Sequence, residues 1–315
     1  MSTMTLNGAV KRSTTAPTSQ DHAHLRAFAA LLDLIRDRTR SVADRYQVGA
    51  YIVGRSGSSK TYTVLETLEA LGTPWTYRNS RMSAMGLWCL LEEHPEHTVV
   101  LDDISTLFDQ KGALQIIMAA LGGSPGKPRT VTYVTKDERR EFEFSGGIIA
   151  ISNVPLSRDP LADAVASRMV LLEHEPSDEM LAAFMRDRSA HGHEDMTPEE
   201  CLAVVEFVIA ETRACDYRLD LRYMKKAWQD YRMDNHGFAL RPWKDLVRSS
   251  LKRIITPEAT VGRSDRKAWE QQVALDLFQK YPDDKGLRDE EWHRLTGKAP
   301  DSLYRRKREL GSNHS

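Results

Sequence analysis

The 315-residue sequence has few cysteines, no excess of either charge and no long apolar run. Cys89, Cys201 and Cys215 lie far apart and lack the spacing of metal ligands. Lysine plus arginine number 44 and aspartate plus glutamate 45, so no global field draws the chain to nucleic acid or to a membrane. No segment approaches membrane-spanning length. We therefore expect a protein of the reducing cytoplasm that does not enter a membrane.

The strongest positive signal is a glycine-rich loop between a predicted strand and a predicted helix. Residues 54–61 follow the apolar run 48–53 and precede the helical pattern 62–70. Backbone N–H groups in such a loop, a helix N-terminus and a lysine bind phosphates, and a threonine hydroxyl holds Mg²⁺. The predicted nucleotide-binding residues are Gly54, Arg55, Ser56, Gly57, Ser58, Ser59, Lys60 and Thr61, with Thr61 also a metal ligand. The alternative is an ordinary Gly/Ser turn.

One position departs from the usual pattern of this loop. Ser59 stands where the last glycine of G-x-x-x-x-G-K-[ST] is expected. A side chain there crowds the backbone or strains a positive φ. We therefore expect weaker nucleotide binding or slower turnover than in a standard loop.

Two further apolar strands end in polar side chains that suit the same edge of a parallel sheet. Residues 98–101 precede Asp102 and Asp103, and residues 147–152 precede Asn153. Ligands of open α/β sheets bind at this edge. We predict that Asp102 holds Mg²⁺, Asp103 orients or activates the attacking water, and Asn153 hydrogen-bonds that water. The alternatives are solvated aspartates and an asparagine that opens a turn.

Arg168 follows a short helical pattern and precedes a last apolar strand. An arginine so placed could reach the γ-phosphate bound by a neighbouring subunit, as an arginine finger. The alternative is that it caps the C-terminus of its own helix.

In this order the motifs resemble those of the AAA+ ATPases. GRSGSSKT is similar to Walker A, VVLDD to Walker B, IIAISN to sensor 1 and AVASR to the finger-bearing segment. The paired aspartates resemble the replication-initiator and helicase-loader branch. The resemblance implies an α/β P-loop NTPase (AAA+) fold with a parallel sheet and a helical lid. It also implies ATP and Mg²⁺ as ligands and self-association into a ring or spiral, with six subunits expected.

We predict four segments along the chain. Residues 1–24 form a disordered tail, 25–175 the ATPase core, 176–258 the helical lid and 259–315 a C-terminal helical domain. Strand patterns stop after residue 175, which places the start of the lid. In the lid, Arg222 lies where a sensor-2 arginine could touch nucleotide, although a solvated arginine on an amphipathic helix is as well supported.

Residues 129–134 and 139–144 predict a β-hairpin just before the sensor strand. Both segments alternate and are rich in β-branched or aromatic residues. The hairpin resembles the pre-sensor-1 insert of superfamily 3 helicases, which projects into the pore of a ring and holds DNA. The resemblance implies that Lys136, Arg139 and Arg140 contact DNA phosphates. The alternative is a solvated hairpin tip, because acidic residues lie beside these cations.

The C-terminal segment predicts a helix-turn-helix or winged-helix-like domain. Residues 289–295 and 301–310 are helical and are joined by a glycine-containing turn. We predict that Arg305, Arg306 and Lys307 on the second helix meet DNA phosphates or base edges. The alternative is a charged terminal helix that packs on the lid.

These motifs predict an ATP-dependent, oligomeric ATPase that acts on DNA, in replication initiation, as a helicase or in mobile-element maintenance. No primase, nuclease or transposase signature accompanies them, so separate replication or mobile-element proteins are expected as partners. A second hypothesis is a non-catalytic ATP-binding switch that assembles on DNA and recruits a partner. Ser59 and the aspartate in place of glutamate favour it. A third is a chaperone-like ATPase that acts on protein.

Overall fold

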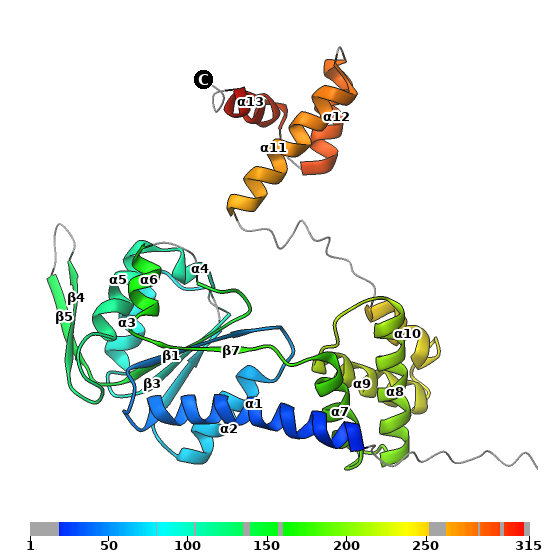
Figure 1. The fold of residues 1–315 in the computed structure, drawn as a ribbon, viewed down its shortest axis with the longest axis horizontal. Helices are drawn as coiled ribbons and strands as arrows, with labels where there is room; N and C mark the ends of the chain where they lie inside the picture. The colour runs from blue at the N-terminus through cyan, green and yellow to red at the C-terminus, as the bar shows by residue number, and fades with distance from the viewer. Residues whose placement is uncertain are drawn as a thin grey trace, which may run out of the picture. The chain divides into compact units, whose positions relative to one another are not determined.

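The computed structural model describes residues 19–79, 81–103, 105–134, 139–156, 160–251, 263–282, 284–296 and 299–311. The chain divides by its contacts into two units, Met1–Leu251 and Lys252–Ser315. Helices α1 to α10 and strands β1 to β7 belong to the first unit, and helices α11 to α13 belong to the second (Figure 1). The predicted boundary between residues 258 and 259 lies outside the described residues.

A five-stranded parallel sheet forms the centre of the first unit, in the order β2-β3-β6-β1-β7. Its strands are β1 Gly49–Gly54, β2 Trp75–Arg78, β3 Thr98–Asp102, β6 Gly147–Ser152 and β7 Val170–His174. The three central strands are almost wholly buried apolar runs, as a parallel sheet covered on both faces requires. The register pairs Val53 with Ser152 and Asp102 with Ile151, so their carboxyl ends meet at one edge.

Alternate residues of the strands pack into separate cores on the two faces of the sheet. Val100 and Ile149 belong to the core that includes α1 and α2, and Val99 and Ile148 belong to the core that includes α3, α5 and α6. Figure 1 shows these two groups of helices on opposite sides of the sheet. Their bounds are α1 Ser19–Ala43, α2 Lys60–Leu71, α3 Ala84–Glu93, α4 Ser105–Phe108, α5 Lys111–Ala120 and α6 Pro160–Ala166.

Helix α1 begins at Ser19, so the predicted disordered tail 1–24 is wrong for residues 19–24. Asp21 stabilises this first turn, because it carries negative charge near the helix N-terminus. It also accepts a hydrogen bond from Arg186 of the lid at 3.0 Å. This long-range contact had no local signal in the sequence. Residues 1–18 lie outside the described residues.

The predicted hairpin is present. Strand β4 Arg129–Val134 pairs antiparallel with β5 Arg139–Phe144. The pair packs on α3 through Trp88, whose ring centroid lies 5.2 Å from that of Phe142 and 6.1 Å from that of Tyr133. The hairpin is therefore held on α3 through aromatic side chains of both its strands.

Four helices follow the sheet and form a lid. They are α7 Asp178–Ser189, α8 Pro198–Ala214, α9 Leu221–Asn235 and α10 Trp243–Leu251. Their starts follow local rules: Ser177 caps α7, and Thr197 and Glu200 form a capping box around Pro198 at the start of α8. Phe184 of α7 packs edge-on against Phe28 of α1 at 5.1 Å. The predicted fold class, a P-loop parallel sheet with a helical lid, is confirmed.

The second unit is a small helical domain of α11 Arg263–Lys280, α12 Lys285–Thr296 and α13 Pro300–Gly311. Trp292 and Leu303 are fully buried at its centre. The indole Nε1 of Trp292 also donates to Ser302 Oγ at 2.8 Å, which ties α12 to the first turn of α13. Helix α12 starts before the predicted residue 289. Among the described residues, no helix is both long enough and apolar enough to span a bilayer.

Candidate nucleotide-binding site

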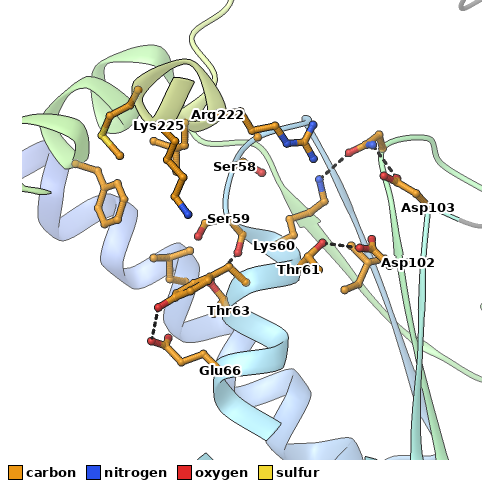
Figure 2. Close-up of a pocket in the computed structure, with 18 of the residues that line it drawn as sticks. Ser58, Ser59, Lys60, Thr61, Thr63, Glu66, Asp102, Asp103, Arg222 and Lys225 are labelled. Atoms are coloured by element: carbon orange, nitrogen blue, oxygen red, sulfur yellow. Dashed lines mark hydrogen bonds between the residues drawn. The ribbon is translucent and has the colours of Figure 1, made fainter. Parts of the chain in front are cut away.

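A cavity of about 470 Å³ lies where the glycine-rich loop, the carboxyl edge of the sheet and the lid meet. Its walls come from α1, α2, the loop between β1 and α2, the ends of β3 and β6, and the lid helices α7 and α9. Figure 2 shows Arg222 and Lys225 entering it from the lid and Lys60 and Thr61 from the first turn of α2. Sequence segments more than 160 residues apart thus share one cavity.

The loop has the backbone that its sequence predicted. Ser59 is the N-cap of α2 with φ 74° and ψ 9°, and its side chain makes no cap hydrogen bond. Gly57 also has positive φ, at 63°. A Cβ on Gly57 would lie 1.7 Å from Asp220 Oδ1 of the lid, so only glycine fits there. The strain expected at Ser59 is therefore present as a left-handed backbone.

Lys60 is buried, and its side chain points back toward the backbone carbonyls at the start of the loop. Its ammonium group donates to Gly54 O at 2.8 Å, to Arg55 O at 2.7 Å and to Asn153 Oδ1 at 3.0 Å. Burial lowers the pKa of Lys60 from 10.5 to about 8, against the opposing effect of Asp103 and Asp102. A bound triphosphate would stabilise this buried ammonium group, because hydrogen bonds to charged phosphate oxygens are stronger than those to the neutral carbonyls they replace.

Thr61 and Asp102 form a pair that suits a magnesium ion. The Thr61 hydroxyl donates to Asp102 Oδ2 at 2.9 Å, and Asp102 is only 7% exposed. Hydroxyl and carboxylate oxygens are the ligands that Mg²⁺ prefers, and it usually takes one or two carboxylates plus substrate phosphates. The described residues hold no cluster of three or more His, Cys, Asp or Glu side chains that could bind a metal alone. The donor set fits a magnesium ion bound together with phosphate.

Asn153 connects the lysine to the second acid. Its Nδ2 donates to Asp103 Oδ1 at 2.8 Å while its Oδ1 accepts from Lys60. Burial raises the pKa of Asp103, and the charge of Asp102 raises it further. A raised pKa makes a carboxylate a better proton acceptor near neutral pH. Asp103 and Asn153, the two side chains predicted to act on the attacking water, therefore lie in contact, and Asn153 also contacts the predicted phosphate ligand Lys60.

Arg222 also lies at the cavity. It is in the first turn of α9, where Asp220 caps the helix, and its Nη1 donates to Ser56 Oγ at 2.7 Å. The backbone N–H of Leu221 donates to Gly57 O at 3.0 Å. The lid therefore contacts the phosphate loop directly.

The Arg55 side chain does not line the cavity, whereas the prediction for this loop concerned its backbone N–H groups. It is 8% exposed and faces the lid, donating to Pro176 O at 3.0 Å, to Asp178 Oδ1 at 2.7 Å and to Leu219 O. Its predicted contact with nucleotide is thus left to its backbone. The buried acceptors explain this orientation, because a guanidinium can satisfy three of them at once.

Sequence reasoning missed the contributors from outside the motifs. Tyr77 of β2 donates its hydroxyl to Asp102 Oδ2 at 2.8 Å. Burial raises the pKa of Tyr77 to about 12, with the hydrogen bond to Asp102 and its charge adding to the shift. Further residues that no motif marked also line the cavity: Phe184, Arg188, Met224 and Lys225. An apolar pattern alone marks Phe184 and Met224 as core.

Arg168 does not line the cavity of its own chain. It is exposed after α6, and its Nη1 donates to Ala164 O at 2.6 Å. This is the helix-capping contact of the alternative interpretation. Its exposure also leaves the guanidinium accessible to a second subunit.

The residues predicted to bind DNA differ in their surroundings. Lys136 lies outside the described residues, and Arg139 and Arg140 are exposed on β5. In the second unit Arg305 is exposed, but Arg306 donates to Glu270 at 2.8 Å, and Glu270 is 1% exposed. The Lys307 Nζ atom lies 3.7 Å from the centre of the Phe278 ring. Arg306 thus faces the core of its domain.

The strand order, the phosphate loop and the lid that closes on it define the class of this chain: it has the P-loop NTPase fold of the AAA+ type. No protein-family model matches the sequence. A protein of Enterobacteria phage T4, an uncharacterized 36.7 kDa protein in the nrdC-mobD intergenic region, is 30% identical over 142 residues. That match spans 39% of this chain and 43% of the phage protein.

Solved structures give more distant likenesses. The Thermotoga maritima RuvB Holliday junction branch migration motor is 15% identical, with 89% of this chain and 84% of that chain covered and a TM-score of 0.44. The Aeropyrum pernix Orc1 protein in complex with DNA is 13% identical, with 90% and 82% covered and a TM-score of 0.47.

Proposed function

We propose that this chain is an ATP-binding, Mg²⁺-dependent ATPase that assembles into an oligomer and acts on DNA. One observation carries the nucleotide part: Lys60, Thr61, Asp102, Asp103 and Asn153 meet in one cavity at the carboxyl edge of a parallel sheet. Lys60 would bind the phosphates, and Thr61 and Asp102 would hold Mg²⁺, which neutralises charge on the transferred phosphoryl group. Asp103 and Asn153 would hold the attacking water.

The nucleotide assignment is tested by ATP turnover and by binding of a fluorescent ATP analogue. Lys60→Ala is expected to abolish both, because the phosphates lose their buried cation. Lys111→Ala is the matched control, since Lys111 is exposed on α5 and lies outside the cavity. Wild-type binding in Lys60→Ala would remove the assignment.

The DNA part rests on exposed cations at two places, Arg139 and Arg140 on the hairpin and Arg305 in the second unit. Phosphate contacts of this kind weaken steeply with salt. We expect DNA to stimulate ATP turnover and to bind more tightly at low salt. Absence of DNA binding at low salt would favour action on a protein instead.

A second candidate function is a switch that binds ATP without efficient hydrolysis. The left-handed Ser59 and the aspartate at position 103 favour it, because both depart from the usual catalytic pattern. Tight Mg²⁺–ATP binding and ATP-dependent assembly with negligible turnover would distinguish the switch from the ATPase.

A further inference from the structure

Tyr77 reaches the metal site from a strand that carries no recognised motif. Its backbone pairs with Val100 in the parallel register of β2 and β3. Side chains at paired positions lie on the same face of a sheet, and Asp102 lies on that face two residues beyond Val100. Two strand residues advance about 6.6 Å, which is about the reach of a tyrosine side chain. The ring can therefore lie along the strand and place its hydroxyl on the carboxylate.

The carboxylate of Asp102 is held by two donors on one oxygen. Thr61 Oγ1 and the Tyr77 hydroxyl donate to Oδ2 at 2.9 Å and 2.8 Å. Oδ1 has no hydrogen-bond partner within the described part of the chain. When Thr61 turns to a metal ion, Tyr77 is the donor that still fixes the orientation of the group.

We propose that Tyr77 is a positioning residue for the magnesium site, and that its hydroxyl holds Asp102 with Oδ1 presented to the metal. This inference rests on the proposed function. It assigns to β2 a part in metal binding that the sequence motifs give only to β3 and the start of α2. Groups that hydrogen-bond a metal ligand set its orientation, and their loss typically lowers metal affinity by about 10–100-fold.

The test is a Mg²⁺ titration of fluorescent ATP-analogue binding, with a parallel measurement in excess chelator. Tyr77→Phe keeps the ring and its packing but removes the donor. We expect the Mg²⁺ midpoint to rise about tenfold while the affinity for metal-free nucleotide is unchanged. Mn²⁺ binding followed by electron paramagnetic resonance, with a non-hydrolysable nucleotide, is expected to weaken by a similar factor.

The chain offers a matched control. Tyr231 donates to Glu200 Oε1 at 2.8 Å in the lid, and neither residue lines the cavity. Tyr231→Phe removes the same chemical group from the same kind of bond, so it is expected to leave the Mg²⁺ midpoint unchanged.

Three results separate the possible outcomes. An unchanged Mg²⁺ midpoint in Tyr77→Phe overturns the inference while the proposed function stands. If Tyr77→Phe weakens binding of metal-free nucleotide as much as binding with Mg²⁺, the hydroxyl has a structural role and the inference is overturned. The same holds if Tyr77→Phe lowers the unfolding temperature much more than Tyr231→Phe does. Wild-type protein that binds no nucleotide with Mg²⁺ overturns the proposed function itself.

Discussion

At position 59 the chain keeps a serine in a conformation that favours glycine, with φ 74°. A non-glycine residue in the left-handed region costs about 1 kcal/mol or more. Ser59→Gly removes this cost but adds backbone entropy to the unfolded state, so we expect a net gain of about 0.5–1 kcal/mol in the free energy of unfolding. Urea denaturation measures it. Ser59→Ala keeps the strain and should show no gain, whereas destabilisation by glycine would contradict this account.

The lowered pKa of Lys60 makes stability depend on pH in a defined window. The pKa is about 8 in the fold and 10.5 in the unfolded chain. Between these values the unfolded state binds more protons, so stability rises with pH through the window, and below pH 8 the full cost of the buried charge is present. We expect the free energy of unfolding of the nucleotide-free wild type, relative to Lys60→Met, to rise by on the order of 1–3 kcal/mol from pH 8 to 10.5.

Urea denaturation at several pH values compares the two proteins, so other titrating groups cancel. A difference that stays flat across the window would show that Lys60 keeps its ordinary pKa. A difference that falls as pH rises would reverse the sign of the argument. Both proteins are measured without nucleotide, because bound phosphate would restore the charged form.

At the scale of elements, the phosphate loop and the lid are joined through the buried Arg55 side chain. Its guanidinium contacts the start of α7 and the segment before α9. Arg55→Ala removes the donor for two buried carbonyls and for Asp178, so we expect a loss of about 2–3 kcal/mol in the free energy of unfolding, together with weaker nucleotide binding. Arg248→Ala breaks an exposed pair with Glu211 and serves as the control, with a much smaller loss. Equal losses of unfolding free energy in both variants would show that the Arg55 side chain does not join the loop to the lid.

The same contacts show which parts of this fold were predictable. The central strands are continuous apolar runs between turn residues, so their positions along the chain and the polar residues at their carboxyl ends followed from local patterns, and the hairpin followed from alternation. Tyr77 and the lid partners of Arg55 did not follow. Tyr77 lies 25 positions from Asp102, and Arg55 lies 164 positions from Leu219. Such pairs depend on strand register and on how the lid docks, and neither leaves a local pattern.

In the C-terminal unit, neighbouring arginines on α13 have opposite surroundings. Arg305 is exposed, while Arg306 bonds the buried Glu270. We expect Arg305→Ala to weaken DNA binding and to reduce the slope of log affinity against log salt by about 1. Arg306→Ala should instead lower the unfolding temperature and leave the slope unchanged. Fluorescence anisotropy over a salt series measures the slope, and thermal unfolding measures the loss of stability. If Arg306→Ala, and not Arg305→Ala, reduced the slope, Arg306 would be the residue that contacts DNA.

At the scale of the assembly, a complete site needs two copies if Arg168 acts on the nucleotide of a neighbour. Arg168 is exposed and lies outside its own cavity, so Arg168→Ala is expected to bind ATP normally yet lose turnover. Lys60→Ala loses binding but keeps its arginine. In a ring with head-to-tail interfaces, equal mixing of the two inactive variants restores a wild-type pairing at about a quarter of the interfaces. We therefore expect the mixture to recover about a quarter of wild-type turnover per subunit, measured after subunit exchange. If Arg168 only caps α6, each complete site lies within a single chain, so either Arg168→Ala keeps its turnover or, if loss of the cap inactivates it, the mixture recovers no activity.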